Sequence, residues 1–399
     1  MNKLFLLDAY ALIYRSYYAF IKNPRINSKG LNTSAIIGFV NTLQEVLEKE
    51  QPTHIGVAFD PHGPTFRSEA FPEYKAQREA MPEDIRRAVP IIKDLLEAYR
   101  IPVLQVDGYE ADDVIGTIAT RLGGVTSKAA DNNGTTEAKT NGTIDEEQTE
   151  VFMLTPDKDY GQLVSNNVKI FRPRHGGGYE VMGPKEICEK YGITKTDQVI
   201  DLLALMGDSA DNFPGCPGVG EKTAVKLINE FGSVEGLLSK TNELKGALKG
   251  KVEEHIDEIK MSYFLATIKT DVPVTIELDS LKLTSPDEEK LGKLFDELEF
   301  KSLKDRVLKK IEKKQKPTNG ELSLFDFFPT EGQEDSKKSN FESLKTIPHK
   351  YQLVDNEEEI LKLYSKIKTN DFFSLDTETT STSAIDAELV GLRLRCEGI

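Results

Sequence analysis

LFLLD (4–8) is a short apolar run that ends on an aspartate, and HIGVAFD (54–60) repeats this arrangement further along the chain. VFMLTPDKD (151–159) is a third β-rich run with aspartates at its end. Strands that alternate with helices predict a mainly parallel sheet flanked by helices on both faces. The expected fold class is therefore α/β. The helices are predicted at about 34–50, 82–99 and 111–122.

Composition divides the chain into four parts. Residues 123–150 contain Asp or Glu six times, Lys twice and few large apolar side chains, which predicts a disordered insertion. Residues 301–316 contain eight Lys or Arg against two acids, and a polar linker follows them. The expected parts are an α/β catalytic core over 1–183 that includes the insertion, a helical subdomain over 184–300, a basic helix end and disordered linker over 301–347, and the truncated start of a further domain over 348–399.

The bulk composition is typical of a soluble globular chain, with 399 residues, 38% of them hydrophobic and 29% charged. No apolar run approaches the ~20 residues of a membrane span, and the N-terminus leads directly into a strand, so neither a membrane nor a secretion signal is expected. Cys188, Cys216 and Cys396 lack metal-ligand spacing and fit a reducing cytoplasm. The net charge of −15 does not exclude nucleic acid, because carboxylates in one pocket can hold cations while Lys and Arg elsewhere meet phosphates.

Nine acids lie in five segments at strand ends and helix starts. Since ligand sites in open α/β sheets form at the carboxyl ends of strands, these acids are expected to converge. No His or Cys accompanies them, so Mg²⁺ or Mn²⁺ is a better candidate than zinc. Two such ions about 4 Å apart activate water and stabilise the leaving oxygen of a phosphodiester. The candidate metal ligands are Asp8, Asp60, Glu110, Asp112, Asp113, Asp157, Asp159, Asp208 and Asp211.

Each acid alone also has a simpler interpretation. An aspartate after a strand is usually a helix cap, and acids in a first helical turn are favoured by the helix dipole. Five acid-bearing turns together are difficult to explain by capping, so a joint cation site is preferred. Asp157 and Asp159 are expected to point to one side of an extended chain. Glu110 and Asp113, three residues apart, are expected to share a helical face.

Five stretches resemble, in chain order, the signature motifs of the 5′ nuclease domain of bacterial DNA polymerase I. They are LLDAYALIYRSYYA (6–19), AFDPHGPTFRSEAFPEYKAQREAMPEDI (58–85), GYEADDVI (108–115), TPDKDYGQLVS (155–165) and GDSADNFPGCPGVGEKTA (207–224). The resemblance covers about residues 1–300 and keeps every acid of the family pattern. It implies a PIN-like α/β fold with a helix–hairpin–helix subdomain, and two or more Mg²⁺ ions held by the nine acids.

The segment FRSEAFPEYKAQREAMP (66–82) places bases and an aromatic residue after the second strand. If 73–79 is helical, Tyr74 and Arg78 share a face and Lys75 lies beside them. A cation there neutralises a scissile phosphate, and an aromatic ring stacks on an unpaired base. The alternative is an ordinary amphipathic surface helix. The resemblance makes this segment the arch that meets a 5′ single strand, with catalytic candidates Arg67, Tyr74, Lys75 and Arg78.

PGVGEKTAVKLINEFGSVEGLL (217–238) predicts a helix–hairpin–helix. The glycines permit a tight turn and close approach to phosphate at a helix start, and two lysines at i and i+4 reach the same backbone. A tight helix connection explains the turn alone equally well. The resemblance implies duplex binding here and a K⁺ ion held by backbone carbonyls. The DNA-binding candidates are Gly218, Val219, Gly220, Lys222, Thr223 and Lys226.

Two further motifs follow residue 316. SLDTET (374–379) resembles the first motif of a 3′–5′ proofreading exonuclease, with Asp376 and Glu378 at i and i+2. The further acids of that fold are missing, so no activity is expected there. ELSLFDFF (321–328) resembles a sliding-clamp peptide at 321–325, although Glu321 replaces the usual glutamine; docking on the chain's own domain is the alternative.

These observations predict a structure-specific 5′–3′ exonuclease and flap endonuclease of DNA replication and repair. The expected substrates are DNA with a 5′ flap or nick and RNA–DNA primer junctions, cut by a monomer in a bacterial cytoplasm at the nucleoid. No polymerase activity is expected from these residues. A related RNase is disfavoured by the helix–hairpin–helix, which suits duplex DNA. A non-catalytic flap- or clamp-binding module is disfavoured because binding alone gains nothing from nine acids beside phosphate.

Overall fold

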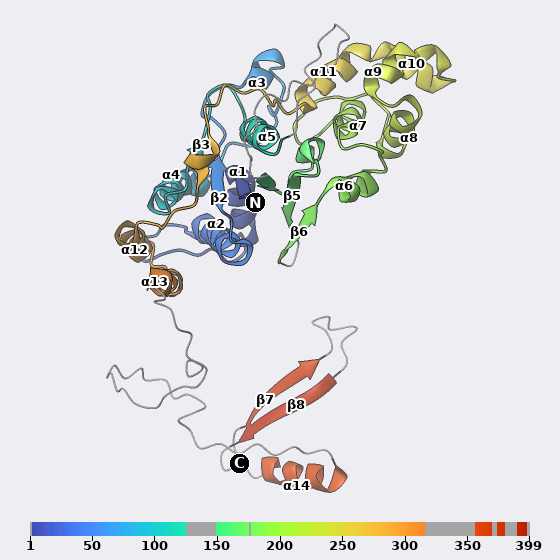
Figure 1. Cartoon of the computed structure of the whole chain (residues 1–399). Helices are drawn as coiled ribbons and strands as arrows, with labels where there is room; N and C mark the ends of the chain where they lie inside the picture. The colour runs from blue at the N-terminus through green and yellow to red at the C-terminus, as the bar shows by residue number, and fades with distance from the viewer. Residues whose placement is uncertain are drawn as a thin grey trace. The chain divides into compact units, whose positions relative to one another are not determined.

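The computed structural model describes residues 2–124, 149–174, 177–315, 356–368, 373–379 and 389–396. It contains two compact units, Met1–Pro317 and Thr318–Ile399 (Figure 1). Most of the predicted insertion, from 125 to 148, lies outside the described residues, as does the predicted clamp peptide. None of the described helices is long and apolar enough to span a bilayer.

A six-stranded sheet organises the first unit, with the strand order β3-β2-β1-β4-β5-β6. All neighbouring pairs are parallel except β5 and β6, which are antiparallel. The central position of β1 gives Leu4 a partner on each side, His54 and Val151. The predicted α/β class with a mainly parallel sheet is confirmed. The strands are β1 (Asn2–Asp8), β2 (His54–Ala58), β3 (Val103–Leu104), β4 (Thr149–Leu154), β5 (Val168–Pro173) and β6 (Tyr179–Met182).

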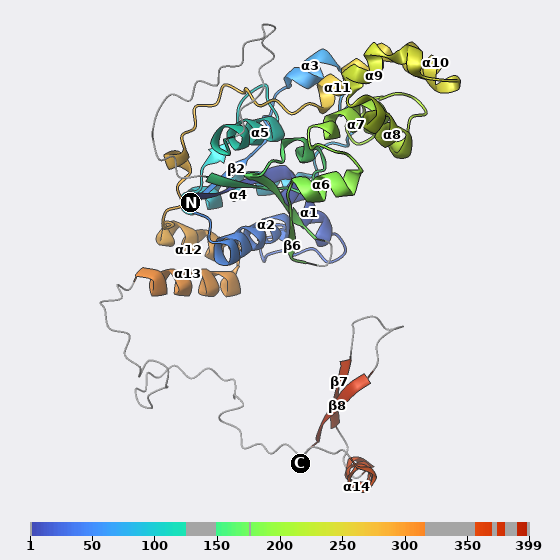
Figure 2. The ribbon, with the colours of Figure 1, turned by 45° about the vertical axis from the view of Figure 1, so that its right-hand side comes forward.

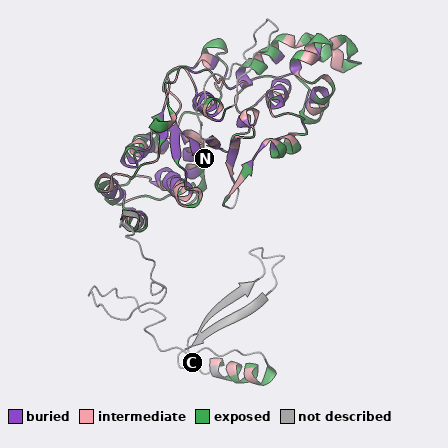
Figure 3. Cartoon of the chain, in the orientation of Figure 1, coloured by how far each residue is buried: buried purple, intermediate pink, exposed green. Residues whose placement is uncertain are grey.

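Side chains of β1 alternate between two hydrophobic cores, one on each face of the sheet. Phe5 and Leu7 belong to one core, and Leu4 and Leu6 to the other, as a period of two requires. Both faces are therefore covered, and the buried residues follow the sheet on either side (Figures 2 and 3). The first core is completed by α1 (Ala9–Ala19), α2 (Ser34–Glu45) with its π-helical extension (Val46–Glu50), α4 (Glu83–Ala98), α12 (Glu288–Glu297) and α13 (Lys301–Gln315).

The second core joins the sheet to the helical region. Val114 of α5 (Ala111–Leu122) shares this core with Leu203 and Leu265 from helices later in the chain. Residues 1–317 thus form one compact unit, within which the 183/184 boundary stays a prediction. The predominantly helical prediction for 184–300 is confirmed. Besides α12, its α-helices are α6 (Pro184–Tyr191), α7 (Gln198–Met206), α8 (Glu221–Phe231), α9 (Val234–Ser239), α10 (Ala247–Glu254) and α11 (Ile256–Ala266).

The basic helix α13 packs against the first core at its start and does not simply extend away from it. Leu303 and Val307 are buried in the first core, so the first turns of α13 belong to the packed unit. In the second unit, α14 (Glu357–Lys368) precedes β7 (Phe373–Thr379), which pairs antiparallel with β8 (Leu389–Cys396). Asp376 and Glu378 lie within β7, so the motif is on a strand as predicted, although the strand continues past the aspartate.

Asp201 of α7 is a buried acid whose ionisation should lower stability. Its side chain is 6% exposed and accepts a hydrogen bond from the Val234 N–H at 2.8 Å. Burial, and to a lesser extent Asp197, raises the pKa of Asp201 to about 6. Because the folded pKa lies above the unfolded value of about 4, the native state holds the extra proton, and stability falls as the pH rises from about 4 to 6.

Asp201→Asn keeps the acceptor for Val234 and removes the charge. We therefore expect its gain in unfolding free energy over the wild type to grow from near zero at pH 4.5 to about 1–2 kcal/mol at pH 8. Urea titrations at both pH values measure this difference. Asp271→Asn, at an exposed loop position, is the control and should show no such trend. A pH-independent difference for Asp201→Asn would contradict the prediction.

Candidate active site

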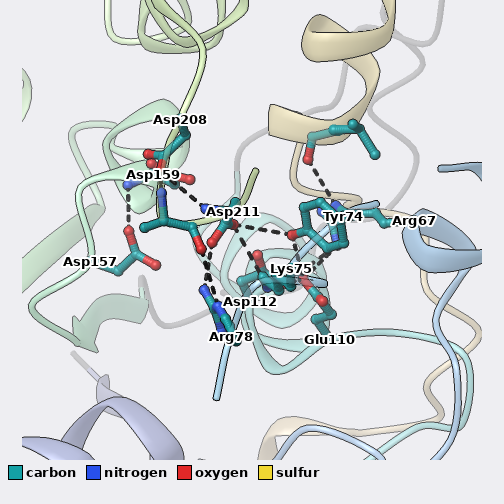
Figure 4. Close-up of polar contacts among 12 residues, drawn as sticks. Arg67, Tyr74, Lys75, Arg78, Glu110, Asp112, Asp157, Asp159, Asp208 and Asp211 are labelled. Atoms are coloured by element: carbon teal, nitrogen blue, oxygen red, sulfur yellow. Dashed lines mark hydrogen bonds and ion pairs between the residues drawn. The ribbon is translucent and has the colours of Figure 1, made fainter. Parts of the chain in front are cut away.

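The acids that follow the strands meet at one edge of the sheet. Asp8 ends β1, Asp60 lies two residues after the end of β2, and the loop after β4 carries Asp157. The N–H of Ala111, the first residue of α5, donates to Asp60 Oδ1 at 2.7 Å, which brings the acidic start of α5 to this edge. The strand ends and the helix start thus lie side by side at this edge, whereas the convergence of the acids on a shared cation stays a prediction. Figure 4 shows Asp157 together with the acids of the neighbouring segments, Glu110, Asp112, Asp159, Asp208 and Asp211.

Asp8 is both a helix cap and the central acid of the site. Its Oδ1 accepts the Ala11 N–H at 3.1 Å, as an N-cap of α1 should. Its Oδ2 accepts from the hydroxyls of Thr155 and Tyr160, each at 3.3 Å. Burial, followed by repulsion from Asp60 and Asp157, raises the pKa of Asp8 to about 7. The simpler capping interpretation is therefore true of Asp8, yet it leaves the repulsion between these acids unexplained.

Asp157 and Asp159 do not lie on extended chain, and that prediction is wrong. A 3₁₀ turn begins at Asp159, and the Asp159 N–H donates to Asp157 Oδ1 at 3.0 Å. The intervening Lys158 points its ammonium group to Asp208 and forms an ion pair with it. The local reason is that an aspartate side chain readily bonds the backbone two residues on, which stabilises a turn. Lys158 was not identified from the sequence.

Residues 72–77 form successive turns, so the helix considered for 73–79 is absent; the helix α3 covers only Phe66–Ala70. Lys75 has a left-handed φ of 55°, and its N–H donates to the Asp211 carbonyl at 2.9 Å. This fold-back still brings the predicted side chains to the acids (Figure 4). The Lys75 Nζ lies 2.9 Å from Glu110 and 3.7 Å from Asp211. Tyr74 donates to Glu110 at 3.0 Å, and Arg78 forms a 2.5 Å ion pair with Asp211.

Arg67 and Asp113 are turned away from the open part of the site. Arg67 is 1% exposed and binds Asp113 through two hydrogen bonds of 2.7 and 2.8 Å, as well as the Leu265 and Thr267 carbonyls. Asp113 is 0% exposed and also accepts the N–H groups of Glu110 and Lys269. The geometry makes Arg67 a buried counterion and Asp113 its partner. Their predicted roles at substrate and metal are therefore corrected.

Carboxylates of like charge at this edge favour a cation. Burial, then repulsion from Asp157 and Asp211, raises the pKa of Asp159 well above its usual value, and its buried Oδ1 has no hydrogen-bond partner among the described residues. An all-oxygen donor set of this kind fits a hard divalent ion. Among the residues described, no three of these side chains converge closely enough to share one ion. Cationic side chains pair with them instead: Lys75, Arg78 and Lys158 from the solvent side, and the buried Arg67, which also reaches Glu110 at 3.2 Å.

The predicted duplex-binding hairpin lies between α7 and α8. Gly218 has a φ of 79°, which only glycine adopts without strain, and Gly220 is the residue before the first turn of α8. Lys222 and Lys226 are exposed on α8, whereas Val219 is buried in the core. A Cβ at Gly218 would lie 2.5 Å from the Nζ of Lys251 in α10. Lys251 therefore covers the turn, a neighbour that no local sequence pattern indicated.

Two family models match nearly all of the first unit. One describes the N-terminal resolvase-like domain of 5′–3′ exonucleases, over residues 3–192, and the other their C-terminal SAM fold, over residues 194–289. The chain belongs to the 5′–3′ exonuclease family. The prediction of a nuclease of this family is confirmed.

Similar proteins include DNA polymerase I of Bacillus caldotenax, which is 39% identical over 319 residues, or 79% of this chain and 33% of that protein. DNA polymerase I of Pseudomonas aeruginosa is 36% identical over 397 residues, or 98% of this chain and 38% of that protein. The chain thus spans about a third of the length of these relatives.

The fold also resembles that of the bacteriophage T5 D15 protein crystallised with metal ions, with a TM-score of 0.53 and 20% identity over 74% of this chain and 98% of that one. A structure of the T5 5′-exonuclease with bound zinc ions gives the same values. This likeness confirms the predicted nuclease fold with its helical subdomain.

Replacing the buried Arg67 tests its structural role. Arg67→Met leaves Asp113 charged and unpaired in the core, so we expect a loss of about 3–5 kcal/mol in unfolding free energy. Arg86→Met is the control, because that pair with Glu83 is 3.2 Å long but exposed and should be worth under about 1 kcal/mol. Urea unfolding measures both. A variant of Arg67 with wild-type stability and lost DNA cleavage would restore a direct role at the substrate.

Proposed function

We propose that this protein is a structure-specific 5′ nuclease that hydrolyses phosphodiesters near the junction of single strand and duplex, leaving a 3′-hydroxyl and a 5′-phosphate. One observation carries the proposal: a sheet edge where Asp60 and Asp157 lie near enough to Asp8 to raise its pKa, and where Lys75 and Arg78 pair with the neighbouring Glu110 and Asp211. Family membership supports it. The substrates would be DNA with a 5′ flap or nick and RNA–DNA primer junctions in replication and repair.

Two or more Mg²⁺ or Mn²⁺ ions are the proposed cofactors. When bound they supply an activated water and stabilisation of the leaving oxygen. Asp113 is excluded from the ligands because Arg67 and two backbone N–H groups occupy its carboxylate. The remaining acids divide by position into Asp8, Asp60, Glu110 and Asp112 at β1, β2 and α5, and Asp157, Asp159, Asp208 and Asp211 at the loops after β4 and α7.

Lys75 and Arg78 are proposed to bind the scissile phosphate. Both cations already lie at the acids, so a phosphate that enters between them finds positive charge in place, at little cost of reorganisation. The Arg78 side chain is 54% exposed and the Lys75 side chain 24%, so solvent and substrate reach both. Tyr74 is 6% exposed, and its hydroxyl bonds to Glu110 and Asp211. We therefore propose that Tyr74 positions these acids and that its buried ring does not stack on a base.

The hairpin at 217–226 is proposed to hold duplex away from the cut. Exposed Lys222, Lys226 and Lys251 supply charge around the Gly218 turn, and Thr223 lies in the first turn of α8. Contacts with phosphate of this kind position a duplex without reading its sequence. A K⁺ ion on carbonyls of this turn is part of the proposal.

Further proposals concern the second unit, the partners of the chain and an alternative function. The Pseudomonas alignment covers 98% of this chain and so reaches the second unit, which supports the proposal that Asp376 and Glu378 belong to a 3′–5′ exonuclease-type domain. Sliding-clamp docking through 321–325, a monomeric state and a nucleoid location remain predictions. A non-catalytic flap-binding module is the second candidate, because Lys75, Arg78 and Lys158 neutralise part of the acidic edge.

Removal of divalent metal should abolish cleavage of a 5′-flap substrate, and Mg²⁺ or Mn²⁺ should restore it. Asp157→Ala should lower the single-turnover rate about 100-fold or more while flap affinity changes far less. Asp94→Ala, at an exposed position on α4, is the control. Full cleavage in chelator, or a wild-type rate for Asp157→Ala, would favour the binding module.

Lys75 and Lys222 should separate chemistry from positioning. Lys222→Ala should weaken binding of plain duplex and of flap alike, and flatten the plot of log K against log salt by about one unit, with little change in single-turnover rate. Lys75→Ala should slow single-turnover cleavage with a smaller loss of affinity, because its charge acts most as the transition state forms. Salt-series titrations paired with single-turnover rates measure both. The same pattern for both variants would refute this division.

A further inference from the structure

Two hydroxyl groups reach Asp8 from inside the protein. Thr155 follows β4, and Tyr160 lies in the 3₁₀ turn after it. Both residues are 0% exposed, and both donate to Asp8 Oδ2 at 3.3 Å. Neither was identified from the sequence, although both lie in the same motif as Asp157 and Asp159.

A buried hydroxyl that serves only packing is unfavourable. Removing a hydroxyl from water costs free energy unless a hydrogen bond replaces the lost contact, and phenylalanine or valine would fill the same space without that cost. Tyr160 packs among apolar residues of the second core, yet its polar tip is directed at Asp8. The position of this tip therefore indicates a role at the carboxylate.

Thr155 also connects two strand ends. Its Oγ1 accepts the Asp157 N–H at 3.2 Å while its own proton is directed to Asp8. The loop after β4 is thereby tied to the end of β1. Since the Ala11 N–H holds the other oxygen of Asp8, both oxygens are oriented by protein donors.

We propose that Thr155 and Tyr160 are positioning residues that form a hydroxyl clamp, which orients the Asp8 carboxylate toward a divalent cation. Partners of this kind, one shell out from a metal, fix the orientation of a ligand and typically change metal affinity about 10- to 100-fold when removed. This inference rests on the proposed function, because it requires a cation at Asp8.

The test is Mn²⁺ binding to the full chain without DNA, measured by calorimetry. Thr155→Val and Tyr160→Phe should each weaken Mn²⁺ binding about 10-fold, and Thr155→Ser, which retains the hydroxyl, should bind as the wild type does. In flap cleavage the variants should need more Mn²⁺ for half-maximal rate but approach the wild-type rate at saturation.

Matched control variants distinguish a loss of Mn²⁺ affinity caused by the missing clamp from a general loss of stability. Thr117→Val and Tyr99→Phe remove equally buried hydroxyls that bond to the Lys269 carbonyl and to Gln44, and should lower the urea midpoint without changing Mn²⁺ affinity. Should Tyr160→Phe fail to fold, the Thr155→Val and Thr155→Ser pair decides alone. Wild-type Mn²⁺ affinity in Thr155→Val, or an equal loss in the controls, would overturn the clamp. Absence of Mn²⁺ binding to the wild type would instead overturn the proposed metal site itself.

Discussion

Repulsion among carboxylates at one edge of the sheet is the constraint on which the rest of this structure depends. Parallel strands end at the same side, so Asp8, Asp60 and the acids after β4 are brought together by topology. Burial and mutual repulsion then raise their pKa values, that of Asp8 to about 7. A fold that gathers such charges must supply cations from elsewhere. In this protein they come from the segments after β2 and β4, as Lys75, Arg78 and Lys158.

Arg67 neutralises carboxylates in the same way deeper in the protein. Its guanidinium joins α3 to the start of α5 through Asp113, and to the chain after α11 through the Leu265 and Thr267 carbonyls. The planar fork of arginine suits this arrangement, because several donors are fixed in one plane. Removal from water alone would lower the pKa of Arg67, but the acids around it outweigh that effect and raise it. The segment that carries Tyr74 and Lys75 is thereby anchored a few residues before it reaches the acidic edge.

The positions of the acids at the strand ends could be predicted from the sequence, but the conformations of the turns beside them could not. An apolar run that ends in aspartate, such as LFLLD, predicts a strand in a parallel sheet and places the acid at the carboxyl edge of that sheet. Residues 73–79 and 157–159 were mispredicted because side chains and distant backbone decide their conformation: Asp211 accepts the Lys75 N–H, and Asp157 accepts the Asp159 N–H. Thr155 and Tyr160 were missed for a related reason. Hydroxyl residues in a strand end or core have no periodicity that distinguishes a donor to Asp8 from packing.

The difference between buried and exposed ion pairs explains how one edge can be both stable and reactive. The pair of Arg67 and Asp113 is dry, so its disruption leaves an unpaired charge in the core, and it has to persist through any reaction. The Arg78 and Lys158 side chains are about half-exposed, at 54% and 48%, so water can solvate these cations when they leave their partners. The partner side chains, Asp211 and Asp208, are only 17% and 6% exposed and would then need another cation. Under the proposed function, these cations would exchange a carboxylate for a phosphate, and the buried carboxylates that they release would bind a divalent ion in their place. In this proposal Arg67 stays paired with Asp113 throughout the reaction. Arg78 and Lys158 change partners, so that the acids are neutralised both before and after a substrate binds.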